Sequence, residues 1–61
     1  MKRIALLDFA TGTIFIRDVP EDMQDADSEE VAASFENELK VHLDDCQYMV
    51  GELTIDQEPK V

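Results

Sequence analysis

The chain has 61 residues, of which 44% are hydrophobic and 33% charged, and fifteen acidic against five basic residues give a formal net charge of −10. A chain this short has room for one domain, residues 1–61, and its single cysteine excludes an internal disulfide and the cysteine-rich zinc sites. Such an acidic protein repels phosphate backbones and anionic lipid surfaces, so we expect neither direct nucleic-acid binding nor membrane binding.

The N-terminal segment predicts no targeting signal. Its apolar run Ile4-Ala5-Leu6-Leu7 stops at Asp8, far short of a signal-peptide core or a membrane-spanning helix. A lone cysteine also agrees with a reducing compartment. We therefore expect a cytoplasmic protein.

The first third of the chain predicts a β-hairpin. Residues 4–9 and 13–19 are rich in Ile, Leu, Phe, Thr and Val, with Ala10-Thr11-Gly12 between them. Three loop residues with glycine in third place suit a type I turn followed by a left-handed residue, because glycine takes a positive φ without a Cβ clash. Pro20 ends the second strand, since it cannot donate to a β-ladder.

Residues 21–27 predict an acidic connecting loop, and a helix follows it. We expect Asp27 to cap the helix by accepting the amide of Glu30, while Glu30 reaches back in a capping box. The helical period then gathers one apolar stripe and leaves Val41 outside it. The predicted stripe consists of Val31, Ala32, Phe35, Leu39, His42 and Leu43.

The last third predicts a third strand. Asp44-Asp45 interrupts the helical pattern, and residues 47–55 read as a strand, with the polar residues 56–61 as a frayed tail. The predicted fold class is therefore α+β, in the order β-β-α-β, with one helix packed on one face of a three-stranded sheet. The strand order stays open: the last strand lies either beside the first or parallel to the second.

The first candidate partner surface is the sheet face that the helix leaves bare. In the predicted strands Ile4 and Leu6 alternate with Ala5, Leu7 and Phe9, and Ile14 and Ile16 alternate with Phe15. Both faces of the sheet are therefore apolar, and one helix covers only one of them. We expect the other face to contact a partner protein or a second copy of the chain, with Phe15 as its candidate residue.

The second candidate surface is acidic. From Asp18 through Leu39 the chain has nine acidic residues and no basic one. A dense carboxylate surface attracts a basic protein and speeds the encounter, or it imitates the phosphates of nucleic acid. The candidate partner-binding residues on it are Glu21, Asp22, Asp25, Glu29, Glu30 and Glu36.

Catalytic and metal-binding interpretations have weaker support. His42 and Cys46 lie four residues apart, but no third orienting group is evident, so we predict no catalytic residue. Together with the two aspartates between them they lack the spacing of a zinc site, so we predict no metal and no cofactor. A calcium loop starting at Asp25 fails at its sixth position, where Glu30 replaces the required glycine.

We therefore expect a small, acidic, non-catalytic binding or regulatory protein that acts through a protein–protein surface. Two alternatives stay open. One is a homo-oligomeric structural or accessory subunit, such as a homodimer held by apolar contacts. The other is an inhibitor that mimics nucleic acid and occupies a basic DNA- or RNA-binding protein.

Overall fold

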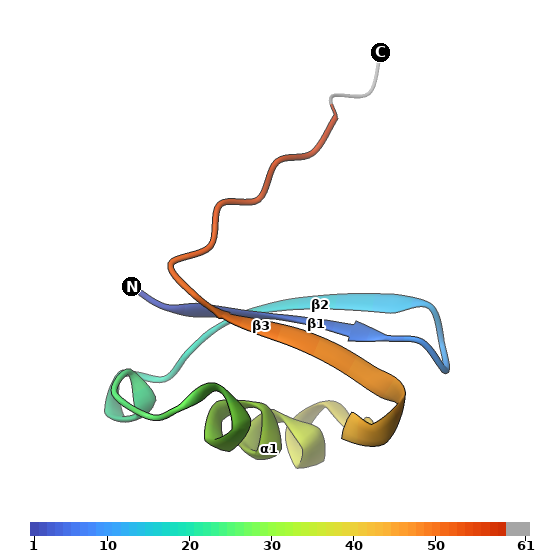
Figure 1. Ribbon diagram of the computed structural model, residues 1–61, viewed down its shortest axis with the longest axis horizontal. Helices are drawn as coiled ribbons and strands as arrows, with labels where there is room; N and C mark the ends of the chain where they lie inside the picture. The colour runs from blue at the N-terminus through green and yellow to red at the C-terminus, as the bar shows by residue number, and fades with distance from the viewer. Residues whose placement is uncertain (59–61) are drawn as a thin grey trace.

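The computed structural model describes residues 1–58 and shows three antiparallel strands and one α-helix in the order β-β-α-β. The sheet order is β2-β1-β3, and the helix lies against one face (Figure 1). This confirms the predicted α+β fold and places the last strand beside the first. The elements are β1 (Arg3–Asp8), β2 (Thr13–Asp18), α1 (Ser28–Leu39) and β3 (Cys46–Gly51), with short 3₁₀ turns at Glu21–Met23 and Leu43–Asp45.

The β1–β2 hairpin forms where it was predicted, with a longer loop. Asp8 pairs with Thr13, so the loop has four residues, from Phe9 to Gly12, rather than three. Gly12 has a φ of 71°, and its amide donates to the carbonyl of Asp8 at 2.8 Å. Glycine takes this left-handed conformation without a steric cost, as the sequence indicated.

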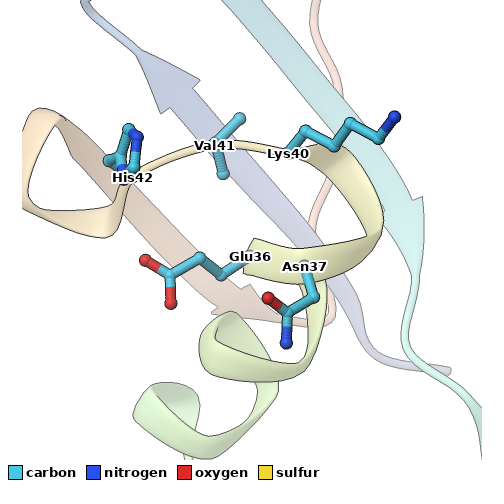
Figure 2. A pocket seen from close by; sticks show the side chains of 5 residues that line it. All are labelled: Glu36, Asn37, Lys40, Val41 and His42. Atoms are coloured by element: carbon cyan, nitrogen blue, oxygen red, sulfur yellow. The ribbon is translucent and has the colours of Figure 1, made fainter.

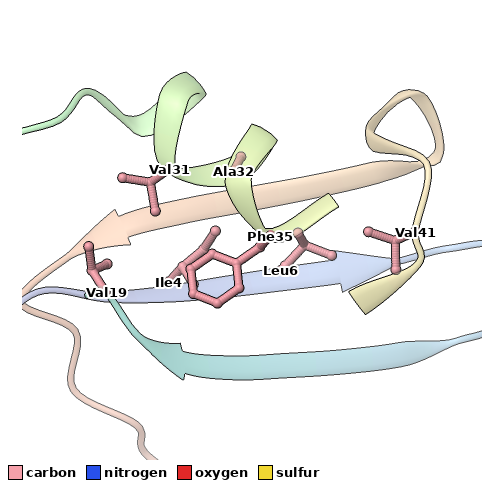
Figure 3. Close-up of a cluster of buried hydrophobic side chains, with 7 residues drawn as sticks. All are labelled: Ile4, Leu6, Val19, Val31, Ala32, Phe35 and Val41. Atoms are coloured by element: carbon pink, nitrogen blue, oxygen red, sulfur yellow. The ribbon is translucent and has the colours of Figure 1, made fainter. Parts of the chain in front are cut away.

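Seven apolar side chains form the core between α1 and the sheet (Figure 3). A twelve-residue helix is about 18 Å long and a six-residue strand about 20 Å, so one helix matches the length of the sheet. The central strand, the helix and the residues that follow β2 and α1 all contribute. The seven are Ile4, Leu6, Val19, Val31, Ala32, Phe35 and Val41.

The helix begins as predicted and ends four residues early. Oδ1 of Asp27 accepts the amide of Glu30 at 2.8 Å, which is the expected cap. At the other end Lys40 adopts a left-handed conformation (φ 57°, ψ 47°), and the amide of Val41 donates to the carbonyl of Glu36 at 3.1 Å. This is the Schellman arrangement, which reverses the chain direction after a helix.

The early end corrects the predicted apolar stripe. Val41 was expected outside it but is buried in the core, because the reversal at Lys40 directs the chain back toward the sheet. His42 was expected on the stripe but is exposed. Leu43 lies in a 3₁₀ turn rather than in the helix, and there it packs half-buried against the core.

Strand β3 also ends earlier than predicted, at Gly51 rather than at Ile55. Gly51 pairs with Arg3, the first residue of β1, and the backbone groups of the preceding residue, Lys2, are directed to the β2 side. Its carbonyl accepts the amide of Val19 at 3.0 Å, and its amide donates to Oε1 of Gln24 at 2.9 Å. The chain after Gly51 therefore leaves the sheet on the side away from α1 (Figure 1). Of the predicted tail, residues 59–61 lie outside the described residues.

The left-handed Lys40 predicts a stabilising substitution. A residue with a Cβ in this conformation is about 1 kcal/mol less favourable than glycine, so Lys40→Gly should raise the free energy of unfolding by about that amount. Chemical denaturation followed by circular dichroism measures the change. Lys40→Ala removes the same side chain without relieving the backbone and should give no gain. An equal gain in both variants would assign the effect to the lysine side chain instead.

Candidate functional site

Within residues 1–58, no helix or strand covers the sheet face opposite α1 (Figure 1). Leu7, Ile14 and Met49 are 37%, 66% and 59% exposed on it. The register makes its residues direct cross-strand neighbours, so they form one continuous patch rather than scattered apolar residues. We call this patch the open face: Ala5 and Leu7 of β1, Ile14 and Ile16 of β2, and Gln47 and Met49 of β3.

Phe15, the residue predicted to represent the bare face, lies on the other side of the sheet. It pairs with Leu6 and packs half-buried against the core, and the guanidinium carbon of Arg17 lies 5.6 Å from the centre of its ring. That placement was therefore wrong. Alternation within β2 was read correctly, but only the pairing with the buried Leu6 shows which set of side chains faces the helix.

Charged groups at one end of the open face are paired. Nε of Arg3 lies 3.2 Å from Oδ1 of Asp18, and the N-terminal ammonium lies 3.6 Å from Oε1 of Glu52. These groups border a surface hollow of about 630 Å³, where residues 52–55 leave the sheet. The open face itself therefore carries no net charge.

The acidic residues gather on the other layer. Ten of the fifteen lie between Glu21 and Asp45, the segment that contains α1. Five of the six predicted acidic residues are exposed and lie in or near the 3₁₀ turn and the first turn of α1. We call them the acidic surface: Glu21, Asp22, Asp25, Glu29 and Glu30. The sixth, Glu36, lies near the opposite end of the helix. The structure thus places the two candidate surfaces on opposite sides of the sheet.

A second hollow, of about 440 Å³, lies at the C-terminal end of α1 (Figure 2). Oε2 of Glu36 accepts the amide of Leu43 at 3.0 Å, so this carboxylate holds the chain reversal. His42 and Cys46 do not share a helix face, because α1 ends before both of them. The hollow is lined by Glu36, Asn37, Lys40, Val41 and His42.

Two further properties bear on the classes of site. Among residues 1–58, no three histidine, cysteine or acidic side chains lie close enough together to hold a metal ion. Within the same residues, no helix combines the length and hydropathy needed to cross a membrane.

Asp8, which sequence reasoning passed over, is buried with only 6% of its surface exposed. Its Oδ1 accepts the amide of Ala10 at 3.0 Å, and its Oδ2 accepts the hydroxyl of Thr11 at 2.9 Å. This is an Asx-type turn, so an aspartate two residues before a turn was the available signal. The carboxylate fixes the hairpin loop and with it the exposed ring of Phe9.

Cys46 lies beside Asp8 in the sheet, paired with it across β1 and β3. Partial burial raises the pKa of its thiol, and the negative charges of Asp8 and Asp45 raise that pKa further. The thiolate is the reactive form of cysteine, so this environment suppresses nucleophilic chemistry at neutral pH.

Comparisons of the chain with protein-family models, with curated proteins and with solved structures find no match.

The environment of Cys46 predicts its reaction with an alkylating reagent. The pH of half-maximal rate should lie above the ordinary thiol value of 9.0, because folding favours the protonated form. Asp45→Asn removes one negative charge from an exposed side chain and should lower that midpoint. Alkylation that is quenched at set times and analysed by mass spectrometry gives the rates. If a low concentration of denaturant leaves the alkylation rate unchanged, the native state is the species that reacts. A midpoint pH at or below 9.0 contradicts the prediction.

Proposed function

We propose that this protein is a small, non-catalytic binding protein that docks onto a protein partner through its open face. The observation that carries this proposal is the side-by-side exposure of Leu7, Ile14 and Met49 on a sheet face that nothing in residues 1–58 covers. Soluble proteins rarely expose a continuous apolar patch, and such patches commonly mark interaction sites.

The apolar exposure also indicates how large the contact is. The exposed parts of Leu7, Ile14 and Met49 equal between one and two whole side chains, so covering them contributes about 3 kcal/mol. Association costs at least about 4 kcal/mol in lost rigid-body freedom. A partner therefore needs adjoining apolar surface as well, and Phe9, which is 66% exposed beside the end of β1, provides it.

Site-specific photo-cross-linking in the organism that encodes the protein tests this proposal. A photoreactive residue replacing Ile14 should give a covalent adduct with the partner protein, because the side chain at this position is exposed on the open face. The matched variant carries the same probe together with Met49→Lys, which places a charge on the same face two strands away. It should lose the adduct. An adduct that survives Met49→Lys, or none from Ile14, contradicts docking through the open face.

The acidic surface supports a second candidate function, the recruitment of a basic protein to the opposite layer. Glu21, Asp22, Asp25, Glu29 and Glu30 are all exposed, and Lys40 is the one Lys or Arg between Glu21 and Asp45. Opposite charges speed diffusional encounter and weaken as salt screens them. Mimicry of nucleic acid is the case in which the basic protein is one that binds DNA or RNA.

A photoreactive residue at Ala33, exposed on α1, tests this second candidate. Its adduct should decline as ionic strength rises, and Glu29→Gln with Glu30→Gln should reduce it several-fold, because both changes weaken the negative field. Met49→Lys should leave it unchanged, because Met49 is exposed on the other side of the sheet, while its neighbours Tyr48 and Val50 pack against the core under α1. An adduct that is indifferent to salt and to the glutamine variant would reject an electrostatic contact.

A further inference from the structure

We propose that the open face takes a second copy of this chain in a two-fold, face-to-face dimer. This inference rests on the proposed function and names its partner. It starts from the central strand, where the side chains directed to the open face are Arg3, Ala5, Leu7 and, one residue past β1, Phe9. When a second copy of this series runs in the opposite direction across from the first, each side chain meets a complementary one.

The middle of the series pairs a large side chain that projects from the face, which we call the projection, with a small one that leaves room above it, which we call the hollow. Ala5 lies between Ile16 and Met49, so a small side chain sits between two large ones. Leu7, in the next row, lies between Ile14 and Gln47. A two-fold axis that runs across the strands between these rows sets Leu7 of each copy over Ala5 of the other. This is the reciprocal contact that a two-fold interface requires.

The same axis also matches the ends of the series. It brings Phe9 of one copy over Arg3 of the other, because these residues lie one row outside Leu7 and Ala5 respectively. Nε of Arg3 donates to Oδ1 of Asp18 at 3.2 Å, and the Arg3 side chain remains 46% exposed, so an aromatic ring can reach it. A guanidinium over an aromatic ring is an attractive contact. Phe9, one of the most exposed apolar side chains, thus gains a partner.

The net charge of −10 on each copy does not prevent this arrangement. Facing sheets pack about 10 Å apart and each helix lies about 10 Å behind its sheet, so the two acidic layers end about 30 Å apart. The Debye length is about 8 Å at physiological salt, so these layers scarcely repel each other. On the facing side the N-terminal ammonium pairs with Glu52, and Asp56 and Glu58 are the acidic residues of the outgoing segment.

The size of the face sets the strength of the dimer. Three strands of six residues span about 14 by 20 Å, which is below the surface that each partner contributes to a standard stable interface. We therefore expect a weak, reversible dimer. Mixed populations should appear at ordinary laboratory concentrations.

Sedimentation equilibrium of the full chain over about 1 µM to 1 mM tests the inference. The wild-type mass should rise from 6.9 kDa toward twice that value and no further. Ala5→Leu fills the hollow and should weaken the dimer at least tenfold, although it makes the face more apolar. The double variant Ala5→Leu with Leu7→Ala exchanges projection and hollow, and the two-fold axis then restores the fit, so the Kd should return to near the wild-type value.

Ala33→Leu is the matched control, because it adds the same side chain to the exposed side of α1 and should leave the mass unchanged. Circular dichroism shows whether each variant remains folded. A wild-type monomer at every concentration, tighter association in Ala5→Leu, or no recovery in the exchanged variant would overturn the dimer. Cross-linking from Ile14 distinguishes failure of the dimer from failure of the proposed function. An adduct with a different protein overturns only the claim that the partner is a second copy, whereas no adduct overturns docking through the open face.

Discussion

The area of a single helix is the constraint on which this structure depends. α1 has twelve residues and lies over a three-stranded sheet, which it can cover on one face only. All seven core residues lie between these two layers, and β1, at the centre of the sheet, contributes Ile4 and Leu6 to them. The side chains that alternate with these two therefore have nothing from residues 1–58 above them, and the open face follows directly from the layer count.

The same layering sorts charge from apolar surface. Ten of the fifteen acidic residues lie between Glu21 and Asp45, in the layer of α1, where Asp27, Glu29 and Glu30 are stabilised by the positive end of the helix dipole. The open face has the paired Arg3 and Asp18 at its end. One side of the molecule is thus suited to long-range electrostatic attraction and the other to close apolar contact, and a single partner cannot cover both without wrapping around the sheet.

Sequence signals predicted the features that local chemistry decides. The hairpin, the Asp27 cap and the bare apolar face follow from glycine at a turn, an aspartate before a helix and period-two alternation. Other features depend on distant residues. Lys40 takes a left-handed conformation that its side chain does not indicate, and β3 ends where its partner strand begins, because Gly51 pairs with Arg3, the first residue of β1. Phe15 was misplaced because a face is assigned by pairing across strands rather than by sequence within one.

Ala5 is the residue that the fold itself explains least. Its neighbours on β1, Ile4 and Leu6, are large because they fill the space under α1, and Ala5 alternates with them on the face that no helix or strand of residues 1–58 covers. Larger β-branched side chains are favoured in strands, so an uncovered central position would gain stability from valine or isoleucine. A small residue flanked by Ile16 and Met49 is instead what a close-packed contact needs to receive a projecting side chain. We therefore propose that the alanine serves the contact on this face rather than the fold beneath it.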